Sequence, residues 1–293
     1  MDRLVKPNFF IAGAPKSGTT NISYYLSQHS NVFMPDNLEP YYFARLDVPE
    51  KYERDIISNE DEYLKLFNNQ NNATMVGESS PVYLYCPNSP RLIKNFLPSA
   101  KIIISLRNPV EIAFSEYLSL KFMKFEKNLT FKQTIDFNEE QLQKNEFHID
   151  SILESGFYYK HLSTFMNEFP ADQIKIIIFE DYIKTPQKII QSIFSFLGLK
   201  EFPNLIDPPK NSYRVPTNEG SKLLMNNSTF RKLSKRLIPT STRQKFGDKF
   251  LVKESKRPPV PHEERNRLKK IYNDDVDSLK KLLDIKLPWN DFN

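Results

Sequence analysis

The sequence predicts an α/β fold of three layers, in which a central parallel sheet is flanked by helices. Two observations support this fold class. Short apolar runs that are typical of buried parallel strands occur near residues 9–12, 102–106 and 174–179. After each run, a turn leads into apolar residues at helical spacing. Strands that alternate with helices favour a parallel sheet, and ligands of such sheets bind where the strands end.

The first predicted strand and helix lie on either side of a turn that is bounded by glycines. Phe9–Ala12 is the strand, Gly13–Gly18 is the turn, and apolar residues at helical spacing follow from Thr19. The chain has 7 glycines among its 293 residues, and two of them bound this turn. Glycine adopts backbone conformations that other residues avoid, so we expect the turn to require them.

The later elements carry clear helix boundary signals. Asn108 is a good N-cap and Pro109 suits a first helical position, so a helix is predicted after the second strand. Pro186 begins a helix after the third strand, and Gly198 is its predicted C-cap. His262–Leu283 is predicted to be a final amphipathic helix.

We expect a single domain over residues 1–293, in which a basic and irregular segment, residues 210–261, wraps the core. Lys210–Arg257 contains 13 Lys or Arg and 3 Asp or Glu, in a chain whose net charge is +5. Such a segment suggests an anionic ligand, which is a phosphorylated nucleotide, a sulfated sugar or nucleic acid. The alternative is a solvated basic face.

Two features bear on the cellular compartment. No apolar run approaches the roughly 20 residues of a membrane span. The one cysteine, Cys86, allows no disulfide within the chain, which fits a reducing compartment. We therefore expect a cytoplasmic protein without a membrane span, and the alternative is a Golgi protein whose anchor has been removed.

The turn Gly13-Ala14-Pro15-Lys16-Ser17-Gly18-Thr19-Thr20 is the strongest functional signal. Its glycines are spaced as in a Walker A loop, so we expect a P-loop-like fold. Such a loop directs backbone N–H groups to one point, and the following helix N-terminus adds positive potential. A Walker A lysine follows the second glycine, whereas here Thr19 occupies that place and Lys16 lies within the loop. We predict a phosphate or phosphosulfate site, and the alternative is a plain strand-to-helix turn.

Pro15–Thr20 resembles the 5′-phosphosulfate-binding loop of the sulfotransferases that use 3′-phosphoadenosine 5′-phosphosulfate (PAPS). Ser105–Glu111, with Ser115 following, resembles the 3′-phosphate-binding segment of that family. The resemblance spans nearly the whole chain and is strongest to the heparan-sulfate and bacterial carbohydrate sulfotransferases. Further sequence motifs typical of the family are Gly77–Pro81, Phe179–Tyr182 and Phe196–Leu199, together with Trp289.

The resemblance implies transfer of a sulfuryl group from PAPS to a hydroxyl or amine of a carbohydrate acceptor, with 3′-phosphoadenosine 5′-phosphate (PAP) as the second product. The protein then needs a base, a cation near the leaving oxygen and an anchor for the nucleotide. Lys16 is the candidate cation. Loop chemistry and the resemblance both assign the 5′-phosphosulfate to Lys16, Ser17, Gly18, Thr19 and Thr20.

The resemblance assigns the 3′-phosphate to Arg107 and Ser115. A guanidinium offers a planar fork for phosphate oxygens, and a hydroxyl adds a donor. The alternative is that Arg107 is a surface residue paired with Glu111. Ser255-Lys256-Arg257 resembles a family loop that closes over the nucleotide, although the glycine that the family has between Lys and Arg is missing, and we expect Lys256 and Arg257 to contact the donor.

Glu39 is the candidate base, because Leu38–Phe43 resembles a Lys-Glu motif in which the Glu deprotonates the acceptor. Leu38 stands where the family has Lys. The alternative is an ordinary surface Glu39. His29 is a rival base, but its place near the end of the first helix favours interaction with the helix dipole.

Glu78 and Ser79 follow a short predicted strand, Met75–Gly77. We expect them to line the acceptor pocket, with Glu78 as a second-choice base. The alternative is that they form hydrogen bonds that fix the loop before Pro81. In the basic segment, Tyr213 either stacks on adenine or simply packs.

We expect no metal, because Cys86 stands alone and the four histidines are dispersed. Two other functions stay open. A P-loop kinase or other phosphotransferase requires Mg²⁺ and a Lys after Gly18, and Glu180-Asp181 offers it a candidate Walker B end. A non-catalytic nucleotide-binding or glycan-binding protein keeps the site without the base. Nucleic-acid binding is not expected, because the basic segment has few aromatic residues and no known motif.

Overall fold

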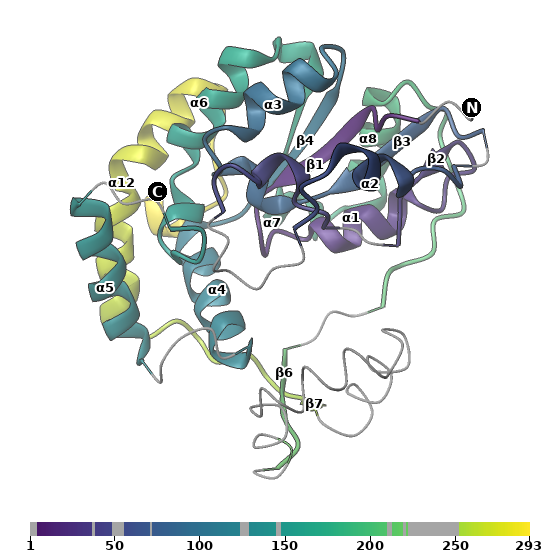
Figure 1. Cartoon of the computed structure of the whole chain (residues 1–293). Coiled ribbons are helices and arrows are strands. Elements are labelled where there is room, and N and C mark those ends of the chain that lie inside the picture. Colours follow the sequence, from purple (N-terminus) through teal and green to yellow (C-terminus); the bar gives the residue numbers. More distant parts are fainter. Residues whose placement is uncertain are drawn as a thin grey trace. The chain divides into compact units, whose positions relative to one another are not determined.

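A computed structural model of the chain is shown in Figure 1. It describes residues 5–36, 39–48, 56–70, 72–123, 129–144, 148–209, 213–218, 221 and 252–293. The chain forms two compact units. The first comprises residues 1–117, 129–208 and 262–293, and the second comprises residues 118–128 and 209–261. A single domain over residues 1–293, with residues 210–261 wrapped around its core, stays a prediction.

The first unit is built on a parallel sheet of five strands in the order β2-β3-β1-β4-β5. Its central strand β1 lies between β3 and β4 (Figure 1). The predicted parallel α/β fold is therefore confirmed. The strands are β1 (Phe9–Gly13), β2 (Val32–Phe33), β3 (Met75–Ser79), β4 (Lys101–Leu106) and β5 (Ile174–Ile178).

Helices and short 3-10 turns connect these strands or follow the last of them. The α-helices are α1 (Thr19–Leu26), α2 (Glu60–Lys65), α3 (Ser89–Phe96), α4 (Pro109–Met123), α5 (Phe131–Gln143), α6 (Tyr158–Glu168), α7 (Phe179–Tyr182), α8 (Pro186–Phe196) and α12 (His262–Leu283). The 3-10 turns are η1 (Tyr42–Ala44), η2 (Pro81–Leu84), η3 (Glu154–Gly156), η4 (Ala171–Gln173) and η6 (Asn290–Phe292). In the described residues, no helix has the length and apolar character of a membrane span.

The two faces of the sheet are covered by different elements, because side chains alternate along each strand. Phe9 and Ile11 of β1 pack in one apolar cluster with residues of α1 and α8. Phe10 points to the opposite face, where its ring lies 5.5 Å from that of Phe43 in η1. Phe43 in turn contacts Phe96 of α3. On that side α12 runs beside α6 (Figure 1).

Several predicted boundaries are confirmed. Asn108 Oδ1 accepts a hydrogen bond from Val110 N–H over 3.0 Å at the start of α4. Gly198 has φ 75°, and Leu199 N–H closes the end of α8 on Phe194 O over 2.8 Å. The last helix spans His262–Leu283, as predicted. Strand β3 continues to Ser79, beyond the predicted end at Gly77.

In the second unit, two short antiparallel strands pair with each other. They are β6 (Arg214–Pro216) and β7 (Val252–Glu254). Ser255 N–H extends the pairing by donating to Tyr213 O over 2.8 Å. Most of the basic segment that was predicted to be irregular, residues 210–261, lies outside the described residues.

Candidate functional site

The loop between β1 and α1 is fastened to the end of the neighbouring strand β4. Ala14 N–H donates to the backbone oxygen of Ser105 over 2.8 Å. The Ser105 hydroxyl donates to the backbone oxygen of Ser17 over 2.8 Å. Ser105 is fully buried, so both bonds are shielded from water. The loop is therefore held at the carboxyl ends of two adjacent parallel strands, where α/β proteins bind ligands.

Gly18 is required at the N-cap of α1 for two reasons. Its φ of 81° is in the left-handed region that favours glycine. A Cβ atom at this position would lie 3.0 Å from Phe179 Cε2 and 3.3 Å from Tyr182 Cε1. Gly18 has no side chain with which to cap the helix, and the first turn of α1 holds no acidic residue. The helix N-terminus therefore keeps its positive potential for an anion.

The residues predicted to bind the phosphosulfate differ in exposure. Lys16 and Thr20 expose their side chains, and Gly18 is partly exposed. Ser17 and Thr19 are buried, at 0% and 5% exposure. Ser17 and Thr19 therefore offer an anion their backbone rather than their side chains. Lys16 has φ 58°, a conformation that is uncommon outside glycine and is concentrated at functional sites.

Arg107 follows β4 and meets the loop directly. Its guanidinium Nη1 donates to the backbone oxygen of Lys16 over 3.0 Å. The guanidinium carbon also lies 4.8 Å from the centre of the Phe179 ring, in a cation–π contact. The structure thus brings together two residues that the sequence predicted from separate motifs. Glu111, the alternative partner of Arg107, forms an ion pair with Arg265.

The backbone of Arg107 is held by Tyr158 of α6. The Tyr158 hydroxyl donates to Arg107 O over 2.7 Å and accepts from Arg107 N–H over 3.3 Å. Tyr158 is fully buried, and burial raises the pKa of its hydroxyl far above the usual range. The hydroxyl therefore stays protonated and can keep donating. Ser115, the other predicted 3′-phosphate residue, is partly buried on α4.

The candidate base Glu39 is exposed and accepts a hydrogen bond from the Tyr41 hydroxyl. Tyr41 has φ 56°, again in the left-handed region. Its backbone N–H donates to Ser80 Oγ over 3.2 Å. The next turn, η1, is held similarly, because Phe43 N–H donates to the Tyr83 hydroxyl over 3.3 Å.

Glu78 lies under this segment and is fully buried. Tyr63 and Tyr83 donate to Glu78 Oε1 over 3.0 and 2.8 Å. Ser80 donates to Glu78 Oε2 over 2.7 Å. Burial, with a smaller contribution from the charge of Glu39, raises the pKa of Glu78 to about 7 against the effect of these three donors.

The burial of Glu78 and Ser79 does not fit the expectation that they line an acceptor pocket. Glu78 is 0% exposed and Ser79 is 3% exposed, because β3 continues through both of them beside β1. The alternative, in which hydrogen bonds fix the segment before Pro81, fits the structure. Two of the hydroxyls bound to Glu78, those of Ser80 and Tyr83, also accept hydrogen bonds from the backbone of Tyr41 and Phe43, in the segment that follows Glu39.

The Glu39 segment and the phosphate loop approach each other through η2. A Cβ atom on Gly13 would lie 2.5 Å from Leu84 Cβ and 3.1 Å from Pro81 O. Gly13, at the end of β1, must therefore be glycine for η2 to pack here. Ser80, which precedes η2, is the residue that holds Tyr41. The same edge of the sheet thus carries both predicted halves of the site.

His29 is packed away from this edge. It is 6% exposed, and its ring lies 5.0 Å from that of Phe194 and 5.7 Å from that of Phe202. Its Nδ1 accepts from Asn31 N–H over 3.1 Å. It lies beyond the C-terminal end of α1, whereas the loop precedes the N-terminal end. These contacts support a packing role for His29 and not a role as a base.

The predicted nucleotide contacts of the basic segment belong to the second unit. Lys256 is exposed and Arg257 is partly buried, and one residue, Ser255, separates them from the end of β7. Their contact with the donor stays a prediction, as does stacking of Tyr213 on adenine.

The structure that follows β5 does not support the phosphotransferase alternative. Strand β5 ends at Ile178, and Glu180 lies in the short helix α7. Glu180 already accepts hydrogen bonds from Asn108 N–H and from the Trp289 ring N–H. The carboxylate of Asp181 pairs with Lys184 at 3.5 Å on the surface. Neither carboxylate is therefore placed as a Walker B residue at a strand end.

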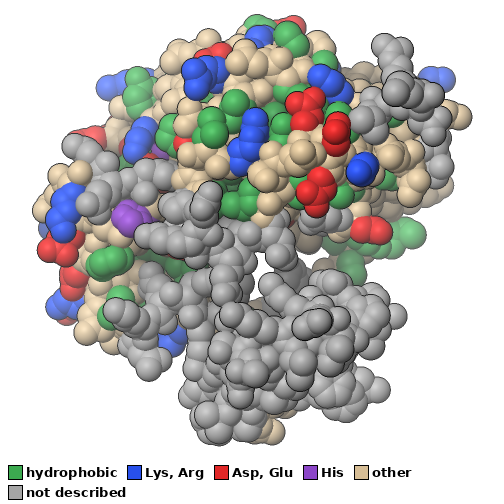
Figure 2. All heavy atoms as spheres, viewed as in Figure 1, with side chains coloured by type: hydrophobic (Ala, Val, Ile, Leu, Met, Phe, Trp, Pro, Cys, Tyr) green, Lys and Arg blue, Asp and Glu red, His purple; other side chains and the backbone are tan. Residues whose placement is uncertain are grey.

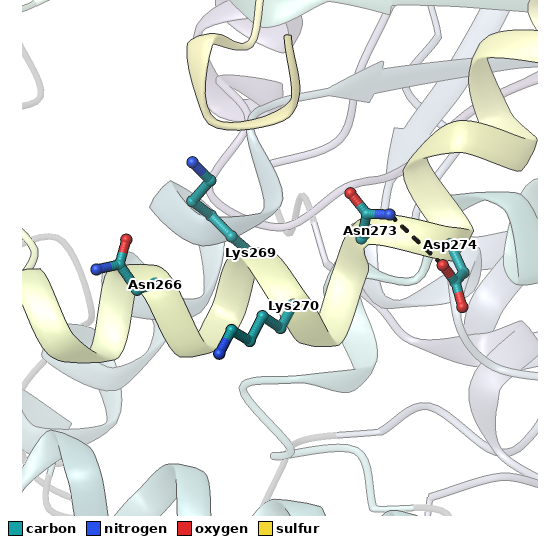
Figure 3. A pocket seen from close by; sticks show the side chains of 5 residues that line it. All are labelled: Asn266, Lys269, Lys270, Asn273 and Asp274. Carbon is teal, nitrogen blue, oxygen red and sulfur yellow. Dashed lines mark hydrogen bonds between the residues drawn. The ribbon is translucent and has the colours of Figure 1, made fainter.

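A surface hollow elsewhere in the first unit does not involve the predicted site (Figure 3). All its lining residues come from α12, and Lys269 and Lys270 point to different sides of the helix. The lining residues are Asn266, Lys269, Lys270, Asn273 and Asp274. Among the described residues, no three His, Cys, Asp or Glu side chains are grouped as a metal site requires, and the expectation of a reaction without metal stays a prediction.

The visible face in Figure 2 shows how the described charges are distributed. Basic and acidic side chains are interspersed there with apolar and polar ones.

Sequence reasoning missed the groups that position the site. Ser105, Phe179 and Tyr158 hold the loop and Arg107, but none of them was assigned a role. Phe179 and Ser105 lie in segments that resemble sequence motifs of the family, so the sequence did contain a signal for them. Tyr158 carries no such signal, because its partner is 51 residues away in the sequence.

The fold and this loop define an α/β protein of the P-loop-like class, with the loop at the carboxyl ends of its central strands. The chain matches the sulfotransferase domain family over residues 6–280, and it belongs to that family. A solved sulfotransferase from Alicyclobacillus acidocaldarius superposes with a TM-score of 0.73 at 25% identity, over 97% of this chain and 98% of that one.

Two relatives are bifunctional heparan sulfate N-deacetylase/N-sulfotransferases. Enzyme 1 of Caenorhabditis briggsae is 27% identical over 212 residues, which is 67% of this chain and 23% of the relative. Enzyme 2 of Homo sapiens is 31% identical over 211 residues, which is 69% of this chain and 23% of the relative. The match thus spans about a quarter of each relative's length. The predicted resemblance to the heparan-sulfate and bacterial branch is confirmed.

Proposed function

We propose that the chain is a PAPS-dependent sulfotransferase that acts on a hydroxyl or amine of a carbohydrate. The observation that carries this proposal is the hydrogen bond between Arg107 and the backbone of Lys16. It joins the loop suited to a phosphosulfate to the arginine suited to a 3′-phosphate. A donor with anionic groups at both ends of its ribose matches such a pair of sites.

The chain's residues fit the donor. PAPS supplies the sulfuryl group when it is bound. The amides at the start of α1 and the exposed Lys16 offer positive potential to the 5′-phosphosulfate. Arg107 and Ser115 are the proposed anchors of the 3′-phosphate, with Lys256 and Arg257 as further contacts.

Glu39 is the proposed base. It takes the proton of the acceptor as the acceptor oxygen or nitrogen forms its bond to sulfur. Lys16 and the loop amides stabilise the electron pair that stays on the phosphate oxygen of PAP when the sulfur–oxygen bond breaks. These separate roles of Lys16 and Glu39 are supported by the exposure of both side chains, because each must reach a bound substrate.

Glu78 is proposed to act through other residues. Its carboxyl group is buried and bound by three hydroxyls, two of which hold the backbone of the segment that follows Glu39. Such a network fixes the direction from which Glu39 approaches the acceptor.

A carbohydrate acceptor is supported by the relatives, since two of them are named for heparan sulfate. An amine acceptor is a specific option, because these relatives are named N-sulfotransferases. A panel of desulfated glycans with free hydroxyls or free amines distinguishes the two forms of the proposal.

Donor binding is tested by thermal unfolding with PAP in the absence of Mg²⁺. The proposal expects PAP to stabilise the chain by about 2.7 kcal/mol at 100 times its Kd. ATP with Mg²⁺ is the comparison, because a kinase would prefer it. Transfer is then measured with sulfur-labelled PAPS on the glycan panel. Stabilisation by ATP with Mg²⁺ and not by PAP would contradict the proposal.

A further inference from the structure

The turn that carries Arg107 is connected to Trp289 through one carboxylate. Glu180 Oε1 accepts from Asn108 N–H over 2.9 Å. Glu180 Oε2 accepts from the Trp289 ring N–H over 2.8 Å. Each carboxylate oxygen thus has its own N–H donor, and hydrogen bonds to a charged acceptor are stronger than neutral ones.

Trp289 also contacts the second group that holds this turn. Its ring lies 5.8 Å from that of Tyr158, at an angle of 43°. Tyr158 binds both the N–H and the carbonyl of Arg107. Trp289 and Tyr158 are 1% and 0% exposed, so neither ring can move without disturbing its neighbours. Trp289 therefore touches both groups that fix the Arg107–Asn108 backbone.

A parallel set of bonds ties the Asn108 side chain to the same region. Asn108 Nδ2 donates to Asp291 Oδ2 over 2.8 Å. Asp291 is in turn bound by Arg265 Nη1 over 2.6 Å. The segment that follows α12 thus contacts the turn at two points, one through Glu180 and one through Asp291.

We propose that Trp289 is a positioning residue for recognition of the 3′-phosphate. It aligns the Arg107 turn through Glu180 and Tyr158 and does not itself contact the nucleotide. The inference rests on the proposed function, in which Arg107 binds the 3′-phosphate. Planar two-point recognition of phosphate is sensitive to small displacements, so a shift of this turn weakens it.

The test compares two nucleotides that differ only in the 3′-phosphate, PAP and adenosine 5′-monophosphate. Trp289→Phe keeps a ring against Tyr158 but removes the N–H that binds Glu180. We expect its Kd for PAP to rise by about tenfold, the effect of losing one charge-assisted hydrogen bond, while its Kd for the monophosphate changes little. Isothermal titration of the full chain measures both constants.

Tyr272→Phe is the matched control. Tyr272 is a buried aromatic residue whose hydroxyl donates to Leu153 O over 3.0 Å. This variant keeps the ring and loses one buried hydrogen bond to a backbone oxygen that is not part of the Arg107 turn, so we expect it to lower stability without changing the ratio of the two Kd values. A purely structural role of Trp289 would give the same pattern as the control.

Glu180→Gln is the second variant, and it keeps the inference testable if Trp289→Phe does not fold. It replaces one acceptor oxygen with an NH₂ group that faces an N–H donor, and we expect the same selective loss of PAP. An unchanged Kd ratio in the folded variants, or an equal loss of both ligands, overturns the inference. Failure of the unmodified chain to prefer PAP over the monophosphate contradicts the proposed function itself, so the two failures are distinguishable.

Discussion

The guanidinium of Arg107 donates a hydrogen bond over 3.0 Å to the backbone oxygen of Lys16, although 91 residues separate them. The bond links the end of β4 to the loop that follows β1. Phe179 supports both sides of it, since its ring lies beside Gly18 and under Arg107. The loop and Arg107, which we propose to bind the two anionic ends of the donor, are therefore held together, and the consequences can be tested residue by residue.

Removal of the Lys16 side chain is expected to slow transfer. Lys16→Ala should lower kcat by about 10²–10³, the usual effect of removing a group that stabilises developing charge. PAP binding should weaken much less, because the loop amides remain. Lys188→Ala, a change at an exposed lysine of α8, is the control. An unchanged rate of transfer from labelled PAPS would remove Lys16 from its proposed role.

Glu39→Gln tests the proposed base. The substitution keeps the shape of the side chain, so the Kd for PAP should stay the same. Transfer should fall by about 10²–10⁴, the usual contribution of a positioned base. Glu140→Gln, on the exposed side of α5, should have no effect. Full turnover by Glu39→Gln would assign the base to another group.

Gly18→Ala tests the shape of the loop. Gly18 and Gly198 have φ of 81° and 75°, but only Gly18 has neighbours within 4 Å of a new Cβ. Gly198→Ala should therefore cost about 1–2 kcal/mol through backbone strain alone. Gly18→Ala should cost more in urea unfolding and should also weaken PAP binding. Equal costs and intact binding in both variants would show that contact between Gly18 and Phe179 is unimportant.

The raised pKa of Glu78 predicts a specific pH dependence of the free energy of unfolding. Its pKa is about 7 in the folded chain against an ordinary value of 4.5. Between these values the folded state therefore binds more protons than the unfolded state. The contribution of Glu78 to the free energy of unfolding is fully present below pH 4.5 and is lost as the pH rises through 7. Glu78→Gln cannot ionise and lacks this loss.

Urea unfolding at pH 5 and pH 8 measures the difference. The unmodified chain should lose about 2–3 kcal/mol more than Glu78→Gln between these conditions. Glu140→Gln should behave like the unmodified chain. Parallel stability curves for the unmodified chain and Glu78→Gln would mean that Glu78 is ionised throughout this range.

Local patterns predicted much of the fold. The limits of α12, the Asn108 cap and the Gly198 cap follow from residues close in sequence. The glycines around Lys16 similarly predicted a loop at the end of β1. These features depend on backbone propensity and on neighbouring residues, which a single sequence contains.

The supporting network could not be predicted in the same way. Glu78 was expected to line a pocket because it follows the predicted strand Met75–Gly77, whereas β3 continues through it beside β1. The partners Trp289 and Glu180 are 109 residues apart. Such long-range contacts leave no periodic signal in a sequence, because they depend on how the elements pack.

A crystal structure of the chain with PAP tests the central claim most directly. The account predicts the 5′-phosphate at the backbone amides of residues 16–20 and the 3′-phosphate within hydrogen-bond reach of the Arg107 guanidinium. A nucleotide bound at another edge of the sheet, or bound at the loop with its 3′-phosphate turned away from Arg107, would contradict it.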